Sequence, residues 1–357
     1  MKVVIAHDYL TQRGGAERVV LELARAFPEA SILTSMYAPD VTFPEFRDLH
    51  VTTLALDRFG SFRRDPRRAL PFLGEAFRRH YVDADLVLAS SSGFAHQVRS
   101  RGPKVVYCHN PPRWLHQWED YSIGLGLAER LAFRALRRRL LTTDRRGARE
   151  AAGYVANSNN VAQRIRSAYG IEPVVIHPPR GLDPDGPTMP VPGLRPGFLL
   201  TVGRPRGYKR TDLLLETVAR MPDQTLVTVG SRPDPRWPAN IQQLRDIPDA
   251  QLRWLYRSAS ALLACSREDF GLTPVEAFGF GTPVGATPEG GYLETCLPGL
   301  TGDWLDAGSV ASMEAGVRAL LDRRWDPAAI REHGEKWTAE VFRRNLTQTV
   351  AGILARQ

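Results

Sequence analysis

The sequence predicts two doubly wound α/β domains, each built on a parallel sheet with helices on both faces. Short apolar runs alternate with amphipathic stretches along the chain, which is typical of repeated strand–helix units. This alternation stops once, in the proline-rich segment DPDGPTMPVPGLRPG, and then resumes. At 357 residues the chain is also long enough for two cores. We therefore expect a first domain over 1–183, a linker over 184–197 and a second domain over 198–337.

The first half begins with the apolar run KVVIAH, which predicts a buried strand, followed by a glycine loop and the amphipathic helix AERVVLELARAF. The stretch NVAQRIRSAYG predicts a helix that ends at Gly170. Continuous apolar runs of this kind indicate strands that are buried on both faces of a parallel sheet. The remaining expected strands of this half are 84–90, 104–110, 153–158 and 173–179.

The second half repeats the pattern after the linker. Helices are expected at TDLLLETVARM, DAQLRWLYRSA and PVEAFGFG, between successive apolar runs. The last segment, about 338–357, has apolar residues at steps of three and four and predicts a long helix, which we expect to pack back on the first domain. The expected strands of this half are 198–203, 225–230, 261–266 and 282–287.

The composition places the chain among globular proteins of a reducing compartment. Apolar residues make up 43% of the sequence, and no run approaches the ~20 apolar residues that a membrane-spanning helix needs. Three cysteines are too few for a disulfide framework or a zinc site. The first residues, MKVVIAHDYL, lack the features of a secretory signal. We expect a cytoplasmic protein.

The positive charge is concentrated in the first half. The net charge is +8, and residues 1–185 carry 27 Lys and Arg against 20 Asp and Glu, a balance of +7. The windows 58–79 and 130–149 hold much of this excess, with arginine among Leu, Phe and Ala at helical spacing. Solvated helix faces are the more frequent outcome for such windows. The alternatives are contact with an anionic membrane at its inner face, or a cradle for a phosphate-bearing acceptor. A nucleic-acid partner is not expected, because no stacking aromatics are interleaved.

The segment SREDFGLTPVEAFGFGTPV carries the strongest candidate site. It places Glu268 and Glu276 eight positions apart, around a glycine turn that leads into a helix. Thr273-Pro274-Val275-Glu276 has the form of a capping box, which would give Glu276 a purely structural task. The same geometry leaves main-chain N–H groups of the turn Phe270-Gly271-Leu272-Thr273 pointing outward, which predicts a phosphate site. Glu268 is not explained by the cap, and a carboxylate beside a phosphate site suits the hydroxyls of a sugar.

Three further features are candidates for the same site. Arg204 and Lys209, in GRPRGYKR, follow the first strand of the second domain, where cations could neutralise a departing diphosphate. Gly14-Gly15 would let the main chain approach a ligand closely. His109, in YCHNPP, follows a strand, and the rigid prolines after it would fix its direction. The plainer interpretations are a surface pair of cations, a tight turn and a structural histidine.

These segments together resemble a known family. EDFGLTPVE resembles the paired-glutamate motif of the retaining glycosyltransferases of family 4, which have the two-Rossmann GT-B fold with facing domains around a central cleft. GRPRGYKR resembles that family's diphosphate-binding segment, and HDYLTQRGGAERVVLELA its glycine loop. RDIPDAQLRWLYRSASALLACS resembles the stretch that leads into the glutamate motif. The likeness covers nearly the whole chain, and the HDYL start and the segment VIHPPRGLD place it near the mannosyltransferase-like branch.

The resemblance implies a role for each candidate side chain. Glu268 would contact hydroxyls of the donor sugar, and Glu276 would bind the ribose of the nucleotide. Arg204 and Lys209 would hold the diphosphate and stabilise it as leaving group. His109 would touch the donor sugar at its reacting face.

The resemblance also implies main-chain contacts and a reaction. Gly14 and Gly15, with the turn Phe270, Gly271, Leu272 and Thr273, would donate hydrogen bonds to phosphate or sugar. The acceptor hydroxyl would attack on the face from which the diphosphate leaves, and the diphosphate would take the proton. Such an enzyme needs no metal and no cofactor. Asp83-x-Asp85 opens an expected buried strand and Asp183-x-Asp185 lies in the proline-rich segment, so both are interpreted as structural rather than as metal motifs.

Two departures bear on the substrates. Asp269 stands where many relatives have glycine, and prolines in 175–183 replace the more usual asparagine-glycine turn. GDP-mannose is the first expectation for the donor, with UDP- and TDP-sugars open, including for a transferase that acts on a natural product. The acceptor is expected to be a hydroxyl of a glycan, of a lipid-linked molecule or of a small molecule.

Three other classes of protein are alternatives. A two-Rossmann nucleotide-sugar epimerase would need no acceptor, and the Arg/Lys segment with the paired glutamates argues against it. An inactive sugar-binding scaffold would have lost Glu268, Arg204 or Lys209, and all three are present. A nicotinamide dehydrogenase would need G-x-G-x-x-G after the first strand, where the sequence has QRGGAE.

Overall fold

The structure is a computed structural model, and it divides the chain into two units that are described separately here. The first unit is Met1–Pro178 together with Ala339–Gln357, and the second is Pro179–Thr338. The expected linker, 184–197, lies within the second unit, because its apolar side chains Val191 and Leu194 are buried in that unit's core. The described residues are 1–117, 126–203, 210–231 and 233–356, and the side chains of 127–136 are outside the description.

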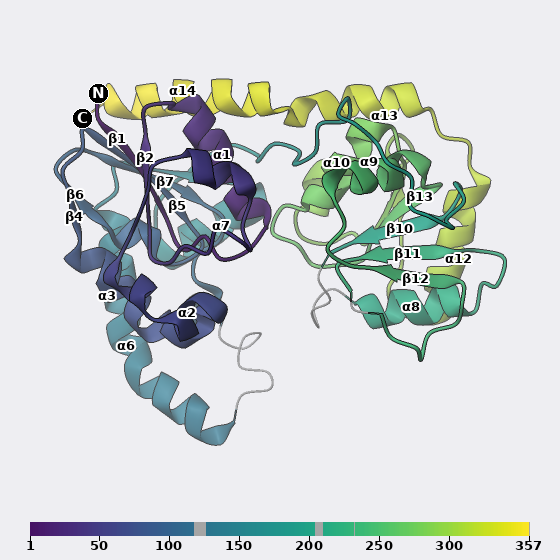
Figure 1. The fold of residues 1–357 in the computed structure, drawn as a ribbon, viewed down its shortest axis with the longest axis horizontal. Helices are drawn as coiled ribbons and strands as arrows, with labels where there is room; N and C mark the ends of the chain where they lie inside the picture. The colour runs from purple at the N-terminus through teal and green to yellow at the C-terminus, as the bar shows by residue number, and fades with distance from the viewer. Residues whose placement is uncertain (118–125, 204–209, 232, 357) are drawn as a thin grey trace. The chain divides into compact units, whose positions relative to one another are not determined.

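The first unit contains a seven-stranded parallel sheet with the order β3-β2-β1-β5-β7-β8-β9 (Figure 1). Its carboxyl edge carries the residues that follow β1, β5 and β7, because those strands are parallel neighbours in register. A separate parallel pair joins β4 (Tyr81–Val82) to β6 (Arg99–Ser100). The strands of the main sheet are β1 (Val3–His7), β2 (Ser31–Thr34), β3 (Val51–Thr53), β5 (Leu86–Ser91), β7 (Lys104–Cys108), β8 (Gly153–Ala156) and β9 (Val174–Val175).

Both faces of this sheet are buried, which explains the continuous apolar runs. Successive residues of β1 alternate between two clusters, with Val4 and Ala6 in one and Val3 and Ile5 in the other. Both ends of helix α7 are set by neighbouring residues. At its start the Ser158 hydroxyl accepts a hydrogen bond from Val161 N at 3.1 Å, and at its end a glycine has a φ of 68°. The helices are α1 (Gly15–Ala26), α2 (Gly60–Arg64), α3 (Leu70–Arg79), α4 (Arg113–His116), α6 (Leu127–Arg149) and α7 (Asn159–Tyr169), with 3-10 turns η1 (Pro44–Asp48), η2 (Ala55–Arg58), η3 (Pro66–Ala69) and η4 (Ala95–Gln97).

The C-terminal helix α14 (Ala339–Leu354) belongs to the first unit. Its apolar stripe is buried in the cluster that also contains α1 and one face of β1, β5 and β7. Arg343 adds an ion pair to Glu22 on α1 at 2.6 Å. The stripe consists of Phe342, Leu346, Val350 and Ile353.

The second unit contains a six-stranded parallel sheet with the order β12-β11-β10-β13-β14-β15 (Figure 1). Helices α8 and α12 contribute to the buried cluster on one face, and α9, α10 and α13 to that on the other. The strands are β10 (Leu199–Val202), β11 (Leu226–Val229), β12 (Ile241–Leu244), β13 (Ala261–Ala264), β14 (Val284–Ala286) and β15 (Gly302–Trp304). The helices are α8 (Thr211–Ala219), α9 (Asp249–Ser258), α10 (Leu272–Phe280), α11 (Tyr292–Thr295), α12 (Val310–Asp322) and α13 (Pro327–Gly334), followed by the turn η6 (Glu335–Trp337).

The predicted class, two doubly wound parallel sheets, is confirmed. Four strands of the main sheets, β2, β3, β12 and β15, have no counterpart in the sequence-based expectation. All three cysteines are buried thiols. Within the described residues, every helix is too short or too polar to cross a bilayer.

Candidate functional site

Glu268 lies in the loop between β13 and α10, at the carboxyl end of the second unit's sheet. The Ser266 hydroxyl donates a hydrogen bond to Glu268 Oε1 at 3.1 Å, and its oxygen lies 2.7 Å from that of the Tyr292 hydroxyl. Ser266 and Tyr292 are buried, whereas Glu268 is half-buried. The carboxylate is therefore held in place from the protein side and stays within reach of a ligand.

The main chain around Glu268 is held by a second loop. Gly291 N donates to Glu268 O at 3.0 Å. A Cβ at Gly290 would overlap Glu268 O, and one at Gly291 would overlap the main chain of Phe270. Only glycines let the two loops approach this closely, so the turn that presents Glu268 depends on residues more than 20 positions downstream.

The N-terminus of α10 lies next to Glu268. Gly271 is the N-cap, with φ of +89°, and a Cβ there would overlap the ring of Tyr292. The N-cap is a glycine, which has no side chain to cap the helix, and the first turn contains no acidic residue. The first amides of a helix have no acceptor within it, and the helix dipole adds positive potential. The turn from Phe270 to Thr273 therefore has the features of an anion site, as the sequence predicted.

The predicted capping box at Thr273–Glu276 is wrong. The helix begins at Leu272, so Thr273 lies inside it, because Gly271 in a left-handed conformation starts the helix earlier. The Glu276 side chain is instead bonded across the core: the Tyr256 hydroxyl donates to Glu276 Oε2 at 2.7 Å. Glu276 is 8% exposed and Tyr256 is fully buried, stacked on Phe280 with 5.5 Å between ring centroids. Sequence reasoning did not identify Tyr256 as a partner.

Two candidate cations lie outside the described residues, and a third was missed. Arg204 and Lys209 both fall in the segment 204–209, of which the structure gives no account. Arg210, directly after it, pairs with Glu289 Oε1 at 2.8 Å. Arg210 precedes α8 and Glu289 follows β14, so both lie on the side of the sheet where Glu268 does. The position of Arg210 beside Lys209 is the sequence signal that could have found it.

His109 follows β7 at the carboxyl edge of the first unit's sheet. Its Nε2 lies 2.8 Å from the Ser90 hydroxyl, which is also 3.1 Å from Nδ1 of the buried His7. Removal from bulk water, and then the proximity of His7, lower the pKa of His109 to about 3. The half-buried ring is therefore neutral near pH 7, and its Nδ1 makes no hydrogen bond with any of the described residues. Sequence reasoning identified His109 but neither His7 nor Ser90.

Asp8, beside His7, is a structural anion in this unit. Its carboxylate accepts hydrogen bonds from the main-chain N–H groups of Ser92, Phe94 and Ala95, at 2.6, 3.0 and 2.7 Å. Asp8 is 3% exposed. These bonds hold the loop after β5 against the end of β1, so the surroundings of His109 are rigid.

Gly14 directly precedes α1, and Gly15 is the first residue of this helix. Gly14 is the N-cap in an extended conformation, which any residue can adopt. A Cβ on Gly14 would lie 2.6 Å from Glu17 Oε2, so the end of that side chain would have to shift. The close approach to a ligand stays a prediction.

The candidates form two groups, one in each unit. The second unit brings together Glu268, the turn 270–273 and Glu276, and the first unit brings His109 to the ends of β1 and β5. In the described part of the chain, no three His, Cys, Asp or Glu side chains are arranged to hold a metal ion. Asp83 and Asp85 make ion pairs with Arg101 instead, Asp83 at 3.1 Å.

Each half of the chain matches a family model of glycosyltransferases. Residues 13–185 match the family model "Glycosyltransferase Family 4", and residues 192–337 match "Glycosyl transferases group 1". The D-inositol 3-phosphate glycosyltransferase of Geodermatophilus obscurus is 32% identical over 213 residues, 49% of this chain and 46% of that protein. The lipopolysaccharide core biosynthesis mannosyltransferase LpcC of Rhizobium leguminosarum bv. viciae is 30% identical over 187 residues, 47% of this chain and 51% of that protein. The matched regions span about half the length of each of these curated relatives.

Solved structures share the whole fold. The Anabaena protein HepE, solved in complex with UDP-glucose, has a TM-score of 0.71 at 16% identity, over 99% of this chain and 100% of that one. The sucrose-phosphate synthase of Thermosynechococcus elongatus has a TM-score of 0.71 at 18% identity, over 100% of both chains. These similarities confirm the GT-B fold. With one family model on each unit and candidate carboxylates at the strand ends, the chain belongs to the family 4 glycosyltransferases.

Proposed function

We propose that this protein is a retaining hexosyltransferase that moves a sugar from a nucleotide donor to an acceptor hydroxyl. The observation that carries the proposal is the position of Glu268, held by Ser266 next to the N-terminus of α10, whose N-cap is a glycine. A carboxylate that accepts hydrogen bonds from sugar hydroxyls, beside a helix end that attracts phosphate, fits the two parts of a nucleotide sugar. A site for phosphate alone would not need Glu268.

The second unit would bind the donor. The diphosphate would lie at the amides of 270–273, with Arg204 and Lys209 as the cations that stabilise it as leaving group. Glu276, held at Oε2 by the Tyr256 hydroxyl, would bind the ribose. The fixed Tyr256 hydroxyl limits how Glu276 can rotate, which suits a contact that must distinguish a ribose.

The first unit would supply His109 and the acceptor side. A neutral His109 ring, bonded through Nε2 to Ser90, offers Nδ1 to a hydroxyl of the donor sugar without placing a charge near the reacting carbon. The acceptor hydroxyl would attack on the face that the diphosphate leaves, and a diphosphate oxygen would take its proton. We propose that this reaction needs no metal, and that activity survives a chelator.

The donor is proposed to be GDP-mannose. Two observations bear on this choice: the curated relative LpcC is named a mannosyltransferase, and the similar Anabaena structure contains UDP-glucose. UDP- and TDP-sugars are therefore the alternatives. The acceptor is a hydroxyl of a glycan, of a lipid-linked molecule or of a small molecule.

The test is a panel of nucleotide sugars, with release of free nucleotide diphosphate as the readout. We expect slow donor hydrolysis with one base and sugar, and faster release when an acceptor is added. Isomerisation of the sugar on an intact donor, without any release, would instead identify the epimerase alternative. Absence of both reactions, together with no binding of any nucleotide sugar by calorimetry, would refute the proposal.

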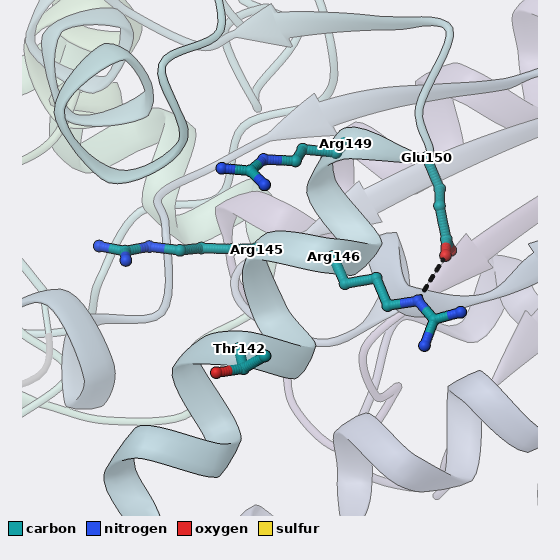
Figure 2. Close-up of a pocket in the computed structure, with 5 residues that line it drawn as sticks. All are labelled: Thr142, Arg145, Arg146, Arg149 and Glu150. Atoms are coloured by element: carbon teal, nitrogen blue, oxygen red, sulfur yellow. Dashed lines mark hydrogen bonds and ion pairs between the residues drawn. The ribbon is translucent and has the colours of Figure 1, made fainter.

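The arginine-rich helix α6 is proposed to contact an anionic membrane surface from the cytoplasmic side. Figure 2 shows Arg145 and Arg149 extending to one side of α6, at a pocket of about 400 Å³, while Arg146 turns to Glu150 at 3.3 Å. Glu150 also pairs with Arg78 at 2.8 Å, so its charge is compensated within the protein. Two parallel cations on an exposed face suit lipid phosphates.

Flotation with vesicles that contain anionic lipid tests the membrane contact. We expect binding that weakens as salt is raised, and that is reduced in the double variant Arg145→Gln, Arg149→Gln. Arg344→Gln, an exposed position on α14, is the matched control. Equal flotation of the double variant and the control would contradict the contact through α6.

A further inference from the structure

The first unit contains a second cavity, which the donor chemistry does not use. This groove has a volume of about 670 Å³, within the usual range of ligand sites, and its lining residues come from α3, α4, α6 and the turns η2 and η4. Its walls are mainly carbon, with Leu56, Leu70, Phe72, Ala76, Trp114 and Leu140 among the lining residues.

The composition of the groove fits a hydrocarbon chain better than a sugar. A glycan needs several polar partners, whereas most of the lining side chains have no polar atom. The Gln97 side chain, 4% exposed, packs between Gly74 of α3 and Gly147 of α6 at the groove. Its Oε1 is buried and makes no hydrogen bond within the described residues, so Gln97 adds little polar surface to the groove. Such a site binds mainly by burial of CH₂ groups.

The rim of the groove adds positive charge. Arg139, exposed on α6, lines it, as do His80 and Arg79. Arg79 is paired with Glu75, also on the rim, at 2.8 Å, so Arg139 supplies the net charge. An occupant with an apolar chain and one anionic group therefore matches both parts of the site.

Aromatic side chains mark the outer end. Phe72 is 53% exposed and stacks on Phe62 with 6.3 Å between ring centroids, and Phe62 contacts Phe59, which is 50% exposed. Exposed apolar side chains that cluster in this way are typical of a surface that binds a ligand, a partner or a membrane.

The inner end leads toward the catalytic edge of the sheet. Trp114 and Phe94 line the groove and stack on each other at 5.7 Å. Phe94 N donates to Asp8, and Trp114 lies on α4, which begins at Arg113 shortly after His109. A molecule whose chain fills the groove would thus have its head near the loops that surround His109.

We propose that this groove binds the chain of an amphiphilic acceptor, a long-chain alcohol joined through a phosphate to a sugar that carries the acceptor hydroxyl, with the phosphate at Arg139. As an acceptor site, the groove rests on the transferase function proposed above. The binding itself can be tested without turnover, so the two can fail separately.

The probe is decyl phosphate below its micelle concentration, measured by calorimetry on the full chain. We expect binding much tighter than that of inorganic phosphate, since each buried methylene contributes roughly fourfold. Ala76→Phe, which fills the groove, should weaken decyl phosphate binding at least tenfold, whereas Ala351→Phe, on the exposed face of α14, should not. Arg139→Gln should weaken binding of decyl phosphate but not of the uncharged decyl maltoside.

Phe72→Ser provides a second groove variant if Ala76→Phe does not fold, because the Phe72 side chain is already 53% exposed. Equal affinity of the folded groove variants and the wild type, or of inorganic and decyl phosphate, would overturn the proposal. So would equal affinity of the wild type for decyl phosphate and decyl maltoside. Nucleotide-sugar binding is measured on the same samples: if it is present while decyl phosphate does not bind, only the groove proposal fails. The reverse result would refute the transferase function and leave the groove in place.

Discussion

The hydrogen bond from Tyr256 to Glu276 can be tested by removing one oxygen atom. Tyr256→Phe keeps the ring that stacks on Phe280 and deletes the hydroxyl that donates to Glu276 Oε2 at 2.7 Å. Hydrogen bonds to a charged group contribute about 1.5–3 kcal/mol, and an acceptor left unsatisfied in a buried site costs more than an exposed one. With Glu276 8% exposed and Tyr256 fully buried, we expect a loss of about 2 kcal/mol in the free energy of unfolding of the second unit.

The structure also contains a matched control. Tyr154 is 3% exposed, and its hydroxyl makes no hydrogen bond with the described residues. Tyr154→Phe deletes the same atom without breaking a bond, so we expect a change of less than about 0.5 kcal/mol in the first unit.

Urea unfolding followed by hydrogen exchange and mass spectrometry reports on each unit separately, since peptides from residues 179–338 and 1–178 are distinct. Donor affinity is measured on the same variants, because Glu276 without its fixed partner should bind the ribose less well. If the two variants lose equal stability, or if Tyr256→Phe binds the donor as the wild type does, the reasoning about Glu276 is refuted.

Three further predictions concern the site. Glu268→Gln should leave the thermal unfolding temperature within a few degrees of wild type but lower kcat at least tenfold, since a neutral amide accepts weaker hydrogen bonds from sugar hydroxyls; unchanged kcat would remove Glu268 from the mechanism. Gly271→Ala places a Cβ against Tyr292 at a φ of +89°, so we expect the free energy of unfolding to fall by about 2 kcal/mol or more. Gly170→Ala is the control, because Gly170 also has a positive φ but open space around it. We expect a smaller loss for this control in urea unfolding. His109 has its pKa lowered to about 3, so between about pH 3 and 6.5 the unfolded chain binds more protons, and the free energy of unfolding falls as the pH drops through this range. His109→Gln should lose this part of the acid sensitivity, measured as the difference in urea midpoint between about pH 4.5 and 7, and an equal difference in both proteins would contradict the assignment.

Local patterns were sufficient for most of the fold. The runs at 84–90 and 104–110 predicted β5 and β7, because strands buried on both faces are continuously apolar. Gly170 correctly predicted the end of α7, because a glycine readily adopts the left-handed conformation that caps a helix. The edge strands β3 and β15 were not predicted. Each has only three residues, which is too few for a hydrophobic pattern to be recognised.

The candidate site shows where local patterns fail. TPVE has the form of a capping box, yet Glu276 is bonded to Tyr256, 20 residues away, and nothing near Glu276 in the sequence indicates that contact. Ser90 reaches His109 only because β5 and β7 are neighbours in register. Val191 and Leu194 are buried although prolines surround them, so proline content alone did not mark a free linker. The motif residues are visible in the sequence, whereas the side chains that hold them depend on strand order.

Helix α14 has a consequence for how this protein is made. A ribosome releases residues 1–178 long before 339–357, with the whole second unit synthesised in between. At ~5–20 residues per second the nascent N-terminal half waits on the order of ten seconds or more with the face that will receive Phe342 and Ile353 still uncovered. The unit whose synthesis begins first therefore completes its core last. Chaperones that shield apolar surface would bind it during that interval.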